Sequence, residues 1–396
     1  MVAPALMVPR QSTWVVPVFL AAAAVQATAA PEVRVLLKEE EVLRVVPPRD
    51  ERLQVLDASG RSLGVFARGI TLRAAAEGIA GVGEPQAVLW VRPHQRGGSF
   101  WLLQRRYRGV LKLQLQNGRL QAINQLPLES YLASVVGAEM PHQWPAEALR
   151  VQAVAARTYA MRQLRPQQPF DLKATVSSQV YLGLESETPS TRQAVASTRG
   201  QVLTHGQRLI EAVFHSSSGG LTENSGEVWR QQLPYLKSVP DFDQHSPVFR
   251  WRQPLPQALL QRSFAEIGGV ERIEPLQRTS TGRLRRVLVH GPSGSLELQA
   301  AELRRRLGLR SSFVSFEQPK PAQGPFASLQ DWLGLRPQLI AVGRGFGHGV
   351  GLSQWGAYGL SRRGSSYAAI LAHYYRGAAL SAYRPPSGWP LPPPPP

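Results

Sequence analysis

Residues 127–164 read PLESYLASVVGAEMPHQWPAEALRVQAVAARTYAMRQL and predict two neighbouring helices. From Leu128 to Val136 the apolar residues recur at helical spacing. A Met-Pro pair follows Glu139, and proline disfavours helix in the residue before it, so the first helix should end there. Pro145 suits the first turn of a second, alanine-rich helix over residues 146–164. We therefore expect two closely packed helices with a carboxylate at their junction.

The chain before these helices has the pattern of β-structure. Between Val33 and Gln125, short apolar runs alternate with turn pairs, which predicts a β-rich N-terminal region over residues 30–125. The clearest hairpin lies at Asn117-Gly118, because both turn residues tolerate a positive φ. Together with the helices, this pattern predicts an α+β fold.

Residues 126–384 form the second region that we expect. Residues 192–198 and part of 297–309 should be helical, and 202–204 and 209–214 should be strands. Residues 319–325 have the composition of a linker, and residues 385–396 form a proline-rich tail that should be extended and disordered.

The first 29 residues have the composition of a secretory signal. Arg10 precedes an apolar stretch from Trp14 to Val25, and Ala27-Thr-Ala supplies a small-residue cleavage site. The apolar stretch is short for a membrane span, and the chain contains no cysteine, which is compatible with export without disulfides. We expect an exported protein of the periplasm or cell wall.

The net charge of +18 is carried mostly by arginine. In an exported protein, such a charge favours acidic wall or lipid surfaces as partners. No basic patch interleaved with aromatic residues is visible, so the sequence does not favour nucleic acid as a partner.

A glycine-rich run occupies residues 343–359 and reads GRGFGHGVGLSQWGAYG. Glycine costs about 0.5–1 kcal/mol relative to alanine in regular structure, so such a run needs a reason other than ordinary packing. The spacing lacks the features of a nucleotide-binding loop. Two interpretations remain, a backbone that an extended, hydroxyl-rich ligand approaches closely and a set of tight turns or close internal contacts. We favour the first, a loop that closes a groove.

Glu139 is the acidic residue best placed for proton transfer. It falls at the C-terminal, negative end of a helix dipole and beside apolar residues, and both raise the pKa of a carboxyl group. Glu129 and Glu147 lie in first helical turns, where an acid simply complements the dipole. Hydrolysis of a glycoside normally needs two carboxylates, and no second one stands out. A lone Glu better suits a reaction in which a hydroxyl of the sugar itself displaces the leaving group.

The polar loop after Phe214 could form a hydrogen-bonding rim for sugars or, through His215, half of a metal site. A lone histidine is more often a structural hydrogen-bonding group. A serine nucleophile is disfavoured, because the loop lacks the Gly-x-Ser-x-Gly turn.

Four ordered blocks give the chain a specific resemblance to the stage II sporulation protein D (SpoIID/LytB) family over roughly residues 105–377. They are LPLESYLASVVGAEMP (126–141) continued by AEALRVQAVAARTY (146–159), SQVYLG (178–183), FHSSSGG (214–220) and GFGHGVGLSQWGA (345–357).

The resemblance implies an exported lytic transglycosylase that cleaves peptidoglycan glycan strands to 1,6-anhydro-muramic products. Glu139 would be the catalytic acid/base. The other matching positions would bind the sugar or support the acid; they are Gln152, Arg157, Tyr181, His215, Ser217, His348, Ser353 and Gln354. Two of these have a structural alternative, a buried ion pair for Arg157 and packing for Tyr181.

Some members of the family carry zinc through a histidine and cysteines. Because this chain has no cysteine, we expect neither a metal nor another cofactor. The family also includes amidase enhancers, which provides an alternative role as a non-catalytic wall-binding protein. Its partners would be peptidoglycan and other cell-wall hydrolases.

Overall fold

The computed structural model describes residues 31–319 and 337–383. The expected signal segment, the proline-rich tail and all but the first residue of the expected linker lie outside these ranges. Within them the chain mixes strands and helices, as the α+β expectation requires, and its N-terminal part is β-rich. None of the described helices is long and apolar enough to cross a membrane.

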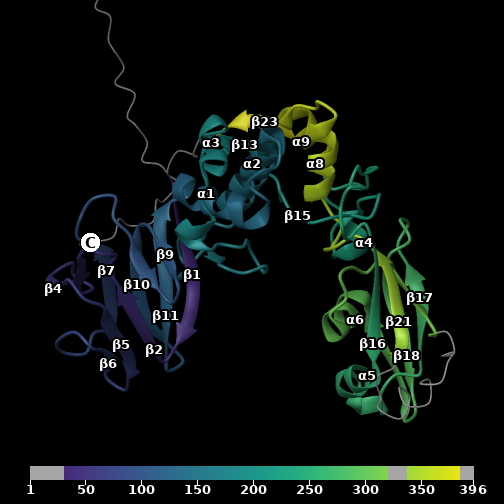
Figure 1. Ribbon diagram of the computed structural model, residues 1–396, viewed down its shortest axis with the longest axis horizontal. Helices are drawn as coiled ribbons and strands as arrows, with labels where there is room; N and C mark the ends of the chain where they lie inside the picture. The colour runs from purple at the N-terminus through teal and green to yellow at the C-terminus, as the bar shows by residue number, and fades with distance from the viewer. Residues whose placement is uncertain (1–30, 320–336, 384–396) are drawn as a thin grey trace, which may run out of the picture. The chain divides into compact units, whose positions relative to one another are not determined.

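The N-terminal region contains two sheets (Figure 1). The first has the strand order β12-β1-β11-β10-β7-β3-β4, and the second has the order β6-β5-β2-β8-β9. The pairs are antiparallel except for the short β12 beside β1. The strands are β1 (Glu32–Glu40), β2 (Val42–Val46), β3 (Leu53–Leu56), β4 (Ser62–Phe66), β5 (Ile70–Ala75), β6 (Gly78–Ala80), β7 (Val88–Pro93), β8 (Phe100–Leu102), β9 (Arg105–Tyr107), β10 (Val110–Gln116), β11 (Arg119–Pro127) and β12 (Leu172–Lys173).

The hairpin expected at Asn117-Gly118 connects β10 to β11. Both turn residues have positive φ, 51° and 72°, which matches the twist of the flanking strands. Alternate residues of β10, among them Leu111 and Leu113, are buried in a hydrophobic cluster that also takes residues from α1 (Leu128–Glu139) and α2 (Ala146–Arg162). The β-rich region and the helices therefore share one core, so residue 125 is not a packing boundary.

The two expected helices are present and pack on each other and on α3 (Pro189–Ser197) (Figure 1). Met140 is extended, with φ −133° and ψ 145°, because Pro141 follows it. Pro145 directly precedes α2, which ends two residues before the expected Leu164. Small side chains on the buried face of α2 allow the close packing of the helices.

The middle of the chain pairs with its C-terminal segments. The remaining elements here are η1 (Gly183–Ser186), β13 (Gln201–His205), β14 (Arg208–Leu209), β15 (Phe214–His215), α4 (Ser225–Val228), β22 (Leu352–Ser353), α8 (Gln354–Arg362), α9 (Tyr367–Tyr374) and β23 (Ala379–Ala382). β13 lies between β14 and β23, and β15 pairs in parallel with β22. The strand expected over residues 209–214 is paired only at its two ends.

Residues from 251–314 and 339–341 form a separate hydrophobic cluster. Two three-stranded sheets, β16-β21-β20 and β17-β18-β19, carry α5 and α6. The bounds are β16 (Arg250–Pro256), α5 (Gln257–Ser263), η2 (Ala265–Ile267), β17 (Arg272–Arg278), β18 (Leu284–Gly291), β19 (Gly294–Gln299), α6 (Ala300–Leu307), β20 (Val314–Glu317) and β21 (Pro337–Arg344). The interval expected as one core, 126–384, thus contains a separate cluster.

Candidate active site

Glu139 is the last residue of α1 and is held by neutral donors. The backbone N–H of Val180 donates to Oε1 at 2.9 Å, and Nε2 of Gln354 donates to Oε2 at 3.2 Å. No cationic side chain among the described residues lies within ion-pair distance of the carboxyl group. Burial raises the pKa of Glu139 above its ordinary value, and the two hydrogen bonds oppose that rise only in part. The carboxyl group is thus disposed to carry a proton.

A cavity of about 520 Å³ opens in front of Glu139. Its walls come from α1 and α2, from residues 176–178 and 213–216, and from residues 346–348 with Gln354. The parallel pairing of Phe214 with Leu352 and of His215 with Ser353 brings the last two segments together. Segments far apart in the sequence therefore meet at the acid.

Two neutral histidines line this cavity. The rings of His215 and His348 lie 5.3 Å apart, and burial lowers both pKa values, that of His348 to about 4 and that of His215 well below its ordinary range. His348 accepts at Nδ1 from the N–H of Val350, so its Nε2 carries the proton and donates to the carbonyl of Phe214 at 3.0 Å. His215 donates from Nδ1 to the carbonyl of Val350 at 3.1 Å. Its buried Nε2 has no partner among the described residues and is available as an acceptor.

These residues do not fit the zinc found in some members of the resembled family. Both ring nitrogens of His348 and one of those of His215 are already engaged in hydrogen bonds. Within residues 31–319 and 337–383, no group of three or more His, Cys, Asp or Glu residues could hold a metal ion.

Five of the expected site residues do not line the cavity, so they are not placed to contact a sugar bound there. Arg157 is fully buried and bonds both carboxylate oxygens of Glu129 at 2.8 Å, the structural alternative stated for it. The buried hydroxyl of Tyr181 donates to Asn124 at 2.8 Å. The other three are Ser217, bonded to Asp243, Ser353, which caps α8, and Gln152, which is fully buried with no partner for its amide among the described residues.

The glycine-rich run does line the cavity, but its glycines are required by the protein itself. Gly345, Gly347, Gly349 and Gly351 all have positive φ, between 71° and 118°. A Cβ on Gly347 would lie 2.6 Å from the Cβ of His215, and one on Gly349 would lie 2.6 Å from Cζ of Arg283. The internal contacts are sufficient to explain these glycines, and the expectation that their backbone also meets a ligand stays a prediction. The glycines permit turns and close internal contacts, and the cavity is lined by Phe346, Gly347 and His348.

The sequence did not single out several residues of the cavity. Trp229 and Phe346 are large side chains that remain 40% and 44% exposed, and Arg304 contributes a cation from α6. Val180 contributes only its backbone N–H, although it lies in a block that the sequence does mark. The exposure of the two aromatic residues is a tertiary property, so no local pattern could have revealed it.

Comparison with known proteins identifies the class. A family model described as stage II sporulation protein (SpoIID) matches residues 116–205, and one described as a domain of unknown function (DUF8618) matches residues 225–351. The chain is 31% identical over 281 residues to stage II sporulation protein D of Bacillus subtilis (strain 168), an alignment that covers 66% of this chain and 76% of that protein. The chain belongs to the SpoIID family.

Two further relatives show the breadth of this family. Stage II sporulation protein D of Bacillus amyloliquefaciens is 32% identical over 288 residues, covering 66% of this chain and 76% of that protein. The amidase enhancer of Bacillus subtilis (strain 168) is 30% identical over 291 residues, covering 64% of this chain and 40% of that protein.

Proposed function

We propose that the protein is an exported peptidoglycan lytic transglycosylase with Glu139 as its general acid/base. The observation that carries the proposal is the carboxyl group itself, which is buried, has a raised pKa and is held by two neutral donors. Among the described residues that line the cavity, Glu139 is the one carboxylate. A single acid/base suffices when a hydroxyl group of the substrate is the nucleophile.

In this mechanism the protonated Glu139 donates its proton to the glycosidic oxygen as the bond to C1 of the muramic acid breaks. The resulting carboxylate accepts the proton of the C6 hydroxyl of the same sugar, whose oxygen bonds to C1. The product is a 1,6-anhydro sugar, no water is consumed, and Glu139 returns to its protonated state. Val180 and Gln354 stabilise the transient carboxylate and fix its orientation.

The remaining surfaces of the cavity suit a sugar ligand. The exposed rings of Trp229 and Phe346 offer flat apolar faces on which a sugar ring can pack. Because both histidines have lowered pKa values, they are neutral at neutral pH. They therefore serve to bind and orient, and proton transfer is left to Glu139.

The second candidate function is that of a wall-binding protein that stimulates another hydrolase. It is favoured by the relative named amidase enhancer, which aligns with 64% of this chain. Export, proposed from residues 1–29, is common to both functions.

Mass spectrometry of purified peptidoglycan after incubation with the protein separates these functions. Anhydro-muramic ends support the transglycosylase. Reducing ends would contradict it in favour of a hydrolase. Intact strands, together with faster cleavage by an added amidase, would instead identify an enhancer.

A further inference from the structure

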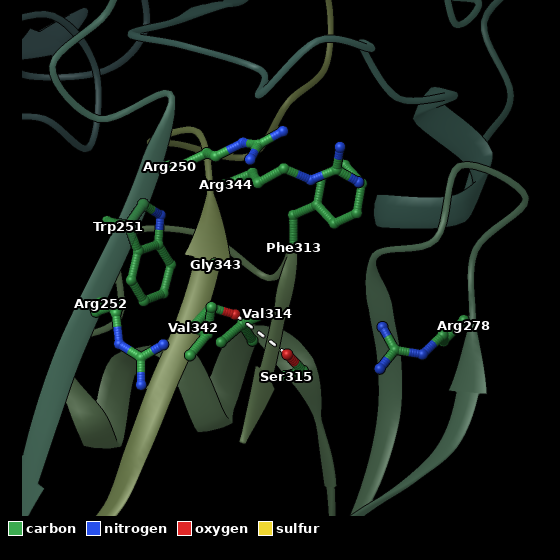
Figure 2. Close-up of a pocket in the computed structure, with 10 residues that line it drawn as sticks. All are labelled: Arg250, Trp251, Arg252, Arg278, Phe313, Val314, Ser315, Val342, Gly343 and Arg344. Carbon is green, nitrogen blue, oxygen red and sulfur yellow. Dashed lines mark hydrogen bonds between the residues drawn. The ribbon is translucent and has the colours of Figure 1, made fainter. Parts of the chain in front are cut away.

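A second cavity, about 620 Å³ in volume, is lined by β16, β20 and β21 together with the end of β17 (Figure 2). Four of its ten lining residues are arginines, Arg250, Arg252, Arg278 and Arg344. Arg278 reaches in from the neighbouring sheet, opposite the other three (Figure 2). We call this cavity the arginine pocket.

The arginine pocket concentrates positive charge at a cost to the fold. Arg250 and Arg344 are direct partners in the antiparallel pairing of β16 with β21, and like charges placed opposite each other destabilise a sheet. Arg252 is offset by Glu317 at 2.9 Å. Within the part of the chain that the structure describes, no carboxylate lies within ion-pair distance of the guanidinium groups of Arg250, Arg278 or Arg344. Three of the four guanidinium groups are thus not balanced by any carboxylate of the described residues.

Neutral groups orient two of these arginines. The guanidinium carbon of Arg344 lies 4.0 Å from the ring centroid of Phe313, a cation–π contact. Nη1 of Arg278 donates to the carbonyl of Gly282 at 2.8 Å. Such contacts fix the guanidinium groups without neutralising them, so that their remaining donors are available to an anionic ligand.

Two aromatic residues, Trp251 and Phe313, are among those that line the pocket. Successive residues of a strand point to opposite faces, so the side chain of Trp251 is buried on the face of the sheet opposite Arg250 and Arg252. There its indole N–H donates to the carbonyl of Gly345 at 2.8 Å. A Cβ on Gly343 would lie 2.2 Å from the ring of Trp251, so glycine is required for the ring to lie against the strand. A guanidinium group stacked on the ring of Phe313, with other arginines around it, suits a ligand that carries carboxylates on a partly apolar frame.

The arginine pocket and the Glu139 cavity are lined by residues that lie close together in the chain. Arg344 lines the first and Phe346 lines the second, and two residues of chain span at most about 7 Å. This short span suits an extended polymer that occupies both cavities.

On the basis of the proposed function, we propose that the arginine pocket is a subsite for carboxylates of peptidoglycan. The carboxylates come from the peptide stems or from the lactyl groups that are freed when stems are removed. In either case the subsite anchors the strand beside the acid.

The test measures binding of soluble glycan strands to the full chain in a Glu139→Gln background, which keeps strands intact. The double change Arg250→Gln and Arg278→Gln removes two guanidinium groups that do not pack on Phe313. Arg262→Gln, at an exposed arginine of α5 outside the pocket, is the matched control. The ligands are strands with stems, strands stripped by an amidase, and both after their carboxylates have been converted to neutral amides.

We expect the double variant to bind carboxylate-bearing strands at least about tenfold more weakly than the control, the effect of losing one charge-assisted hydrogen bond. Strands whose carboxylates have been converted to neutral amides should bind the parent as weakly as carboxylate-bearing strands bind the double variant. The source of the carboxylate is identified by comparing strands with stems and strands stripped by an amidase. The preparation whose affinity falls more in the double variant carries the recognised carboxylate. Equal Kd values for the double variant and the control would overturn the subsite, and so would undiminished binding of neutral strands.

Two further outcomes separate this inference from the proposed function. A soluble phosphodiester polymer that binds the parent more tightly than glycan, with the same dependence on the arginines, would overturn the carboxylate assignment. Strand cleavage by the Glu139→Gln parent would contradict the proposed mechanism. The dependence of strand binding on the arginines would still be measured independently of that result.

Discussion

Glu129 and Glu139 stand at opposite ends of α1 and have opposite surroundings. Glu129, in the first turn, bonds the fully buried guanidinium of Arg157 through both its oxygens, at 2.8 Å each. Glu139, in the last turn, has no cationic partner among the described residues and accepts only from an amide side chain and a backbone N–H. The charge of Glu129 is balanced by that of Arg157, whereas burial raises the pKa of Glu139.

This difference shows how one helix serves structure at one end and chemistry at the other. A bidentate ion pair between Glu129 and Arg157 ties α1 to α2. Neutral donors leave Glu139 able to gain and lose a proton, and it faces a cavity. We infer that the kind of partner, more than burial alone, distinguishes a structural carboxylate from a reactive one.

The largest effect should come from Glu139→Gln. The change keeps the shape of the side chain and removes the titrating proton, so turnover of peptidoglycan should fall by about 100-fold to 10,000-fold while the fold is retained. Release of anhydro-muramic products measures turnover, and circular dichroism checks folding. Undiminished turnover would rule out the acid/base role, and an unfolded variant would make Glu139 structural like Glu129.

The next largest effect is expected at the other end of α1, for Arg157→Met. Loss of the guanidinium strands a partly buried carboxylate, which should lower the free energy of unfolding by about 3–5 kcal/mol. Arg162→Met is the control, because its pair with Glu211 is more exposed and should contribute about 0–1 kcal/mol. Denaturant titration measures both. If Arg157→Met were stable but inactive, its role would lie in the chemistry after all.

A smaller loss of stability should follow Gly349→Val. The new side chain would meet Arg283 and strain a backbone with φ of +85°, at a cost of about 1–3 kcal/mol. Gly364→Val is a matched control, since Gly364 has φ of +86° with open space around it. The difference between their thermal midpoints isolates the contact with Arg283. Equal midpoints, with glycan binding lost only in Gly349→Val, would favour the ligand-contact interpretation of the glycines.

The smallest effect concerns the pH dependence of activity after Gln354→Leu. Nε2 of Gln354 lowers the pKa of Glu139, so its removal should raise that pKa further. Because donation needs the protonated acid, activity falls as pH rises through this pKa, and the falling limb should move to higher pH. The profile of kcat/KM against pH measures the shift. If the falling limb of the profile did not move, the titration would belong to a group other than Glu139.

The same raised pKa should affect stability. A carboxyl whose pKa is higher in the folded than in the unfolded chain contributes stability that is present at low pH and is lost as pH rises through the folded value. This pH dependence should be absent from Glu139→Gln.

Local patterns in the sequence determined much of the fold and the position of the acid. The spacing of apolar residues and the prolines after and before them set the ends of α1 and α2. The Asn-Gly pair set the β10–β11 hairpin. These features depend on backbone preferences of neighbouring residues, which a sequence displays directly. The family blocks likewise marked Glu139, Gln354, His215 and His348, which the fold brings to one cavity.

Only the tertiary structure decided which of the marked residues face that cavity. Arg157, Tyr181 and Ser217 lie in the same blocks as the cavity residues, yet they bond to side chains that do not line the cavity, namely Glu129, Asn124 and Asp243. The arginine pocket also depends on pairing, because Arg250 and Arg344 are 94 positions apart and meet only when β16 aligns with β21. A side chain's partners follow from long-range register and packing, and no local pattern in the sequence specifies them.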